Sequence, residues 1–97
     1  KKRKHNMVGM LATAKAGHDK DQLYIIIEET QDSVWLADGK YKTLQHPKRK
    51  NKKHIQIWKK QTPLVSQIRE KLIRGETVRD EEIKRAMKLL IGSELEE

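Results

Sequence analysis

Apolar and polar positions alternate along the first part of the chain in a pattern typical of short β-strands. Residues 10–14 alternate with a period of two, and residues 23–27 form a β-branched and aromatic run that suits a buried strand. Residues 34–37 and 54–58 alternate in the same way between polar stretches. The polar residues 17–22 begin with a glycine, which tolerates positive φ, and they predict a turn between the first two strands.

A further strand, fourth in chain order, is predicted over residues 40–44. Asp38-Gly39 is a strong signal for a two-residue hairpin turn, because a type I′ turn requires positive φ at both positions. Pro47 would end the pairing, because proline cannot donate to a ladder, and residues 48–54 would form a loop before the last strand. Five short strands joined by tight turns predict a small β-barrel.

The last third of the chain changes to helical spacing. Thr62-Pro63 predicts the start of a helix, since threonine caps helices and proline is tolerated in the first turn. The apolar positions of this helix and its glycine stop are Val65, Ile68, Leu72 and Gly75. A first helix is therefore expected to pack through one face.

A second helix is predicted to start near Thr77 or Asp80, where three consecutive acidic residues suit the positive end of the helix dipole. Gly92 would end it, and residues 93–97 would fray. Its apolar stripe is Ile83, Met87, Leu90 and Ile91. Because each helix has one apolar and one charged face, the pair could cover the barrel as a helical hairpin or offer a docking surface to another protein.

Length and charge limit the classes of function. A chain of 97 residues is one domain's worth, and the lack of cysteine excludes disulfides and thiolate zinc sites. No apolar run approaches the roughly 18 residues of a membrane span, and no signal-peptide pattern follows the basic start, so a soluble cytoplasmic protein is expected. Residues 1–60 hold 15 Lys and Arg against 6 Asp and Glu, whereas residues 61–97 hold 7 against 8. This asymmetry suggests a nucleic-acid or membrane partner for the first part.

Two cationic runs are candidate phosphate contacts. Residues 1–4 form a basic arm that would order on RNA, and five of the first six residues of segment 48–54 are cationic. Charges this dense repel one another, which solubility alone would not require, although a solvated segment is the alternative for each run. Binding several phosphates would release counterions and be steeply salt-dependent. The predicted RNA-binding residues are Lys1, Lys2, Arg3, Lys4, Lys15, His18, Lys20, Lys40, Lys42, Lys48, Arg49, Lys50, Lys52, Lys53, His54 and Trp58.

The aromatic and titratable residues indicate binding rather than catalysis. Trp35, Tyr41 and Trp58 could stack on unpaired bases, or pack in the core or at the barrel rim. Trp58 is the best stacking candidate, because alternation places it on one face with His54 and Gln56. The four histidines lack metal-ligand spacing, and neither a P-loop nor a G-x-S-x-G elbow is present. A protein that is not an enzyme and has no metal, cofactor or small-molecule substrate is expected.

Several segments together resemble the KOW motif, which is found in ribosomal proteins and in transcription elongation factors. The matching residues are the apolar lead-in 9–14, the turn entry 15–17 and the apolar strand 23–27. When residues 34–39 and 47–50 are added, the pattern is similar to the ribosomal protein L fourteen-e group and its small bacterial relatives.

The resemblance covers roughly residues 7–58 and implies an SH3-like barrel there, so with the predicted helices a mainly β protein with C-terminal helices is expected. Its parts would be a basic arm at residues 1–6, an SH3-like KOW barrel at residues 7–60 and a helical extension at residues 61–97. It also implies a non-catalytic, ribosome-associated protein that binds structured ribosomal RNA through basic barrel loops, with ribosomal or transcription proteins as partners of the helices. A transcription-associated KOW module and an adaptor acting through the helices are the alternatives. Asp21 departs from the family pattern, because many members have a glycine there, and it would bring a carboxylate near the RNA.

Overall fold

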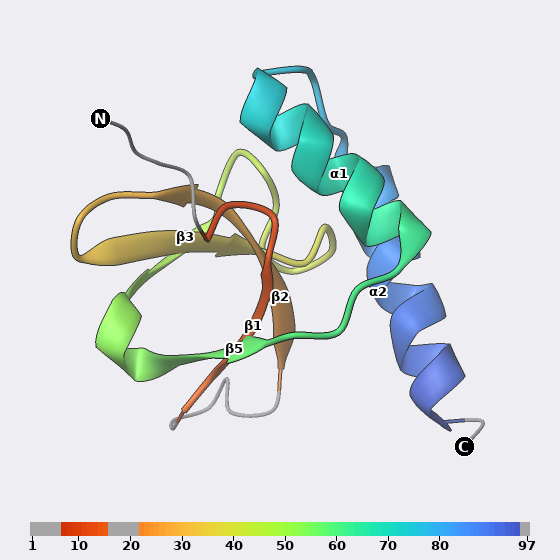
Figure 1. Cartoon of the computed structure of the whole chain (residues 1–97), viewed down its shortest axis with the longest axis horizontal. Helices are drawn as coiled ribbons and strands as arrows, with labels where there is room; N and C mark the ends of the chain where they lie inside the picture. The colour runs from red at the N-terminus through yellow and green to blue at the C-terminus, as the bar shows by residue number, and fades with distance from the viewer. Residues whose placement is uncertain (1–6, 16–21, 96–97) are drawn as a thin grey trace.

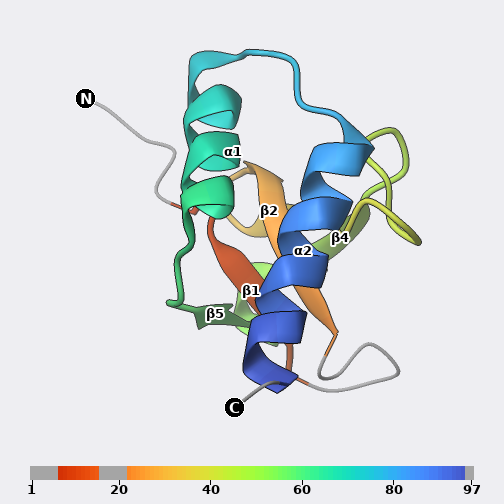
Figure 2. The same ribbon diagram turned by 90° about the vertical axis from the view of Figure 1, so that its right-hand side faces the viewer.

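Two helices lie on one face of an antiparallel sheet of five strands (Figures 1 and 2). The computed structural model describes residues 7–15 and 22–95, with side chains described as far as residue 90. In chain order the elements are β1 (Leu11–Ala14), β2 (Leu23–Glu29), β3 (Ser33–Ala37), β4 (Lys48–Asn51), the 3₁₀-helix η1 (Lys52–His54), β5 (Ile55–Trp58), α1 (Pro63–Arg74) and α2 (Asp80–Leu95). The prediction of a mainly β domain followed by two helices is confirmed.

The strands pair in the order β4-β3-β2-β1-β5, and each neighbouring pair is antiparallel. In the middle of β1, Ala12 lies opposite Tyr24 on one side and Ile57 on the other. A bulge between Ile26 and Glu28 shifts the register of β2 against β3. The edge strands β4 and β5 are linked directly by η1 (Figure 1). Among the described strands no pairing joins β4 to β5, so backbone hydrogen bonds do not close the sheet into a barrel.

Both faces of the sheet are apolar and buried. The cluster on the helix side consists of Leu11, Leu23, Ile25, Ala37, Val65, Ile68, Ile83, Ala86, Met87 and Leu90. The cluster on the opposite side consists of Ala12, Tyr24, Ile26, Val34, Leu36 and Ile55. Strand β2 contributes alternate residues to each cluster, which explains the unbroken apolar run of residues 23–27.

Helix α1 begins and ends at the predicted signals. The hydroxyl oxygen of Thr62 accepts a hydrogen bond of 3.2 Å from the Val65 N–H, and Pro63 is the first helical residue. Gly75 follows the last residue with a left-handed φ of 77°, and its N–H donates to the Leu72 carbonyl. Both caps are made within a few residues of the helix, so the local sequence is sufficient to predict them.

Helix α2 begins at Asp80, one of the two predicted starting points. The prediction that Gly92 ends this helix was wrong, because α2 continues through Gly92 to Leu95. A glycine inside a helix costs about 1 kcal/mol relative to alanine, but it stops a helix only where it takes a left-handed conformation. Residues 93–95 are therefore helical rather than frayed, and residues 96–97 lie outside the described residues.

The prediction of a strand over residues 40–44 was also wrong. Residues 38–47 form the loop between β3 and β4, and β4 occupies part of the segment 48–54 that was predicted to be a loop. The Asp38 carboxylate accepts the first three N–H groups after Gly39, each at 2.9 Å, so these donors do not form a ladder with β3. Pro47 precedes β4 instead of ending a strand.

The helices cover the sheet, which was the first of the two alternatives for their apolar faces. Their buried residues share one cluster with β1, β2 and β3, and both helices lie on the same side of the sheet in Figure 2. Ile73 and Leu89 are the exposed large aliphatic side chains of the described part of the chain. None of the helices in the described ranges combines the length and the apolar character that crossing a membrane requires.

Candidate nucleic-acid interface

Strand β4 is an edge strand composed of three cations and an asparagine, and its side chains divide between the two faces of the sheet. Lys48 and Lys50 lie opposite Leu36 and Val34, which belong to the cluster on the side away from the helices. Both lysines are half-buried, as expected where aliphatic stems cover the margin of an apolar cluster. Lys50 makes no ion pair with a carboxylate in the described part of the chain.

Arg49 lies on the other face of β4. Its register partner is Trp35, and its guanidinium carbon lies 5.8 Å from the centre of the indole ring. Arg49 is exposed and Trp35 is half-buried, so the indole forms a floor beneath the guanidinium. A guanidinium that rests on a ring keeps its N–H groups for acceptors such as phosphate oxygens.

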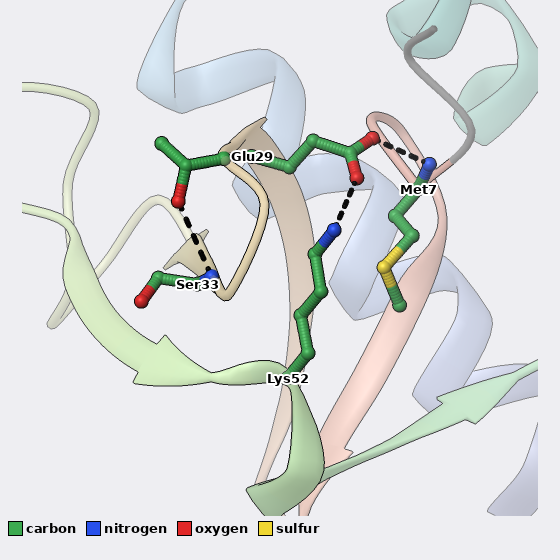
Figure 3. A network of polar contacts seen from close by, with 5 residues as sticks. Met7, Glu29, Ser33 and Lys52 are labelled. Atoms are coloured by element: carbon green, nitrogen blue, oxygen red, sulfur yellow. Dashed lines mark hydrogen bonds and ion pairs between the residues drawn. The ribbon is translucent and has the colours of Figure 1, made fainter. Parts of the chain in front are cut away.

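Lys52, which the sequence predicts to bind RNA, forms an ion pair with a carboxylate of the protein. Its ammonium lies 2.9 Å from one carboxylate oxygen of Glu29, and the other oxygen accepts the Met7 N–H at 2.8 Å (Figure 3). Partial burial alone would raise the pKa of Glu29, but the hydrogen bonds from Met7 and Lys52 outweigh it and hold that pKa below its ordinary value. Glu29, at the end of β2, therefore joins η1 through Lys52 to the segment before β1 through Met7.

The remaining cations of segment 48–54 lie in η1 and face solvent. Asn51 caps η1, because its side-chain oxygen accepts the Lys53 N–H at 3.0 Å. Lys53 and His54 are exposed. The carbonyl of His54 accepts the N–H of Lys15 at 3.0 Å, which brings the exposed Lys15 beside η1. We refer to residues 48–54 together with Lys15 as the basic edge.

The tip of the β3–β4 hairpin lies at the opposite end of β4 from η1. It carries Lys40 and Lys42 on either side of Tyr41, which is 70% exposed. The ammonium of Lys40 lies 5.0 Å from the centre of the Tyr41 ring. Predicted site residues 40 and 42 thus belong to the same hairpin as the cations of β4.

Trp58 lies where packing accounts for it. It is on the face of β5 opposite Ile57, as the alternation predicted, but this face is the one that the helices cover. The indole is half-buried and packs against the helix-side cluster. Core packing, the alternative to base stacking for this residue, is the arrangement found.

Some predicted contacts lie outside the described residues. These are Lys1, Lys2, Arg3, Lys4, His18 and Lys20, together with the Asp21 that departs from the family pattern. Of the described candidates, the structure places Lys15 beside η1 at one end of β4, and Lys40 and Lys42 in the hairpin loop at its other end. Lys52 and Trp58 have structural partners that explain their positions.

Sequence reasoning missed the carboxylates that organise this region. Asp38 could have been found, because aspartate before glycine often accepts backbone N–H groups two or more residues ahead. Glu29 carried no such signal, since its partners Met7 and Lys52 are 22 and 23 residues away in the chain. Lys59 is exposed directly after β5 and was also missed.

Neither a metal centre nor a relative explains the site. Among residues 7–15 and 22–95, no three His, Asp or Glu side chains gather as a metal ion would require. Comparison with models of known protein families and with curated proteins gave no match. The chemistry of the basic edge and the sequence resemblance are therefore the indications of function.

Proposed function

We propose that this protein is a non-catalytic RNA-binding protein that holds structured RNA along the basic edge. The observation that carries the proposal is the sequence Lys48-Arg49-Lys50-Asn51-Lys52-Lys53, placed on an edge strand and the 3₁₀-helix that follows it. The resemblance to the KOW motif points to ribosomal RNA as the target and to association with the ribosome. Backbone phosphates would provide most of the affinity and RNA shape most of the selectivity.

The main structural alternative for a basic edge strand is protection against aggregation. Lysines on an edge strand prevent pairing with another sheet, and one or two are enough for that purpose. Here five cations lie within six residues, and Lys52 forms an ion pair with Glu29. Two like charges 4 Å apart repel by about 1 kcal/mol in water, so the excess destabilises the free protein. Binding a polyanion would remove that repulsion, which supports the proposal.

We propose further that the sheet is a partly open SH3-like barrel. The cluster opposite the helices is at most 5% exposed, although neither α1 nor α2 contributes a residue to it. It includes Ile55 of the edge strand β5 together with Val34 and Leu36 of β3. A sheet that hides its own face in this way must curl, and curling towards closure is the behaviour of small barrels. The basic edge would then line one rim of the barrel.

Of the two alternatives, an adaptor acting through the helices has the less support. The stripes that would dock a partner are already buried against the sheet. What remains exposed is Ile73 on one helix and Leu89 on the other, and single exposed apolar residues are common on protein surfaces. A transcription-associated module would use the same basic edge. It would differ from a ribosome-associated protein in the RNA that it binds and in its protein partners.

Ultraviolet crosslinking of the whole chain to RNA tests the proposal. The chain is irradiated with ribosomal RNA fragments, and the RNA-bearing peptides are identified by mass spectrometry. We expect adducts within residues 38–54, and a lower yield from the double variant Lys50→Gln/Lys53→Gln. The absence of adducts, or adducts confined to residues 63–95, would contradict it.

A further inference from the structure

Tyr41 is the most exposed of the large apolar side chains in the described part of the chain, at 70%. Exposure alone says little, since isolated aromatic residues are common on surfaces. Its position is more informative, because Tyr41 lies in the loop of the same hairpin whose second strand is the cationic β4. Hydrogen bonds within the loop hold the backbone of Tyr41 in place.

The loop is built on a buried carboxylate. Asp38 is 7% exposed, and one of its oxygens accepts the N–H groups of Lys40, Tyr41 and Lys42, each at 2.9 Å. The carbonyl of Lys42 in turn accepts the N–H groups of Asp38 and Gly39, at 2.9 and 3.1 Å. A charge-assisted set of this kind fixes the backbone on both sides of the tyrosine.

A second anchor joins the loop to α2. A carboxylate oxygen of Asp80, the first residue of α2, accepts the Leu44 N–H at 2.8 Å. Gly39 has a φ of 81° and lies so close to the helix that a Cβ there would collide with the Asp80 carbonyl and the Lys84 nitrogen. Figure 2 shows the loop beside the start of α2. The backbone of the loop is therefore held by hydrogen bonds and by close packing against α2, while the Tyr41 ring faces solvent.

The ring and its neighbours have the chemistry of a stacking site for a base. The Lys40 ammonium, 5.0 Å from the ring centre, is held by the ring and keeps a positive charge beside it. Bases stack on exposed aromatic faces, and nearby ammonium groups contact the flanking phosphates. Because Asp38 and Asp80 already order the loop, little conformational entropy would be lost on binding.

We propose that Tyr41 is a stacking platform for an unpaired base of RNA, next to the phosphates held by β4. The site would take a single-stranded segment, such as a bulge or loop, that adjoins the structured RNA on the basic edge. The proposal rests on the proposed function and adds a ligand class to it. It also assigns Tyr41 a role distinct from that of the cations, since stacking contributes affinity that depends little on salt.

The test uses the full chain and two RNA probes. One is an oligouridylate that carries a single fluorescent purine analogue, and the other is an RNA duplex of equal length. We expect the analogue to be quenched on binding, and Tyr41→Ala to remove the quenching. Single-strand affinity should fall roughly 5- to 100-fold at constant salt, the equivalent of one lost stacking contact. Duplex affinity should not change, and Tyr41→Phe should bind as the wild type does.

The matched control is Leu89→Ala, which removes another exposed apolar side chain, 54% exposed, from α2. It should alter neither affinity. Unchanged single-strand affinity and quenching in Tyr41→Ala, with salt-dependent RNA binding intact, would overturn this inference and leave the proposed function standing. Failure of the wild type to bind either probe would overturn both.

Discussion

Three carboxylates fix the loops that surround the basic edge. Glu29 joins Met7 and Lys52, whereas Asp38 and Asp80 between them hold the hairpin loop by four backbone N–H groups. Although burial opposes them by raising the pKa of Glu29, the hydrogen bonds from Met7 and Lys52 hold that pKa below its ordinary value. The cations available to a ligand are those that these carboxylates leave exposed.

Replacing Glu29 by glutamine should destabilise the protein at neutral pH. The amide can still accept the Met7 N–H, but Lys52 loses its carboxylate, so we expect a loss of about 1 kcal/mol in the free energy of unfolding. Urea denaturation of the variant and the wild type measures it. RNA affinity should not fall, because the variant adds no negative charge and frees the Lys52 ammonium.

The same comparison has a defined pH dependence. Because folding lowers the pKa of Glu29 below its ordinary value of 4.5, its contribution is complete above that value and is lost as the pH falls through the folded pKa. The pKa of Glu82 is also lowered, by its hydrogen bond from Lys71. Because Glu82 is present in both proteins, its contribution cancels in the difference between their free energies of unfolding. The difference between Glu29→Gln and the wild type should shrink as the pH falls below 4.5 and through the lower folded pKa of Glu29. A difference that stays constant with pH would show that the Glu29 charge is not its source.

Elements that are defined by residues close together in the chain could be predicted from the sequence, whereas an element that depends on pairing with a distant strand could not. Helix α1 follows from Thr62 and Gly75, whose partners are within three or four residues. Strand β4 could not be predicted, because four polar residues have no apolar alternation and are held in the sheet only by pairing with β3. The cationic segment 48–54 could be recognised in the sequence, but its form as an edge strand followed by a 3₁₀-helix could not.

Asp38→Ala tests the account of the hairpin loop. The substitution leaves three N–H groups without their acceptor, so we expect a loss of about 2–3 kcal/mol in the free energy of unfolding. Amide hydrogen exchange at residues 40–42 should become faster, while exchange in β1 and β2 should follow the global stability alone. Slow exchange at residues 40–42 in this variant would contradict the role given to Asp38.

In the molecule as a whole, the residues that form the two buried clusters differ from the residues that carry the dense positive charge. The helices bury one face of the sheet, the opposite face is buried as well, and the cations of segment 48–54 lie on the edge strand β4 and in η1. Residues 1–60, which include all five strands, hold 15 Lys and Arg against 6 Asp and Glu, whereas residues 61–97, which include both α-helices, hold 7 against 8. The basic edge can therefore change in charge with little effect on either buried cluster.

The salt dependence of RNA affinity in two matched variants tests the central claim most directly. Lys50→Gln/Lys53→Gln removes two cations of the basic edge, and Arg85→Gln/Lys88→Gln removes two exposed cations of α2. Both lower the net charge equally. We expect the slope of log affinity against log salt to become shallower by roughly 0.7–0.9 for each lost phosphate contact in the first variant, and to stay unchanged in the second. Equal changes in both variants, or a change in the α2 variant alone, would show that RNA is not bound along the basic edge.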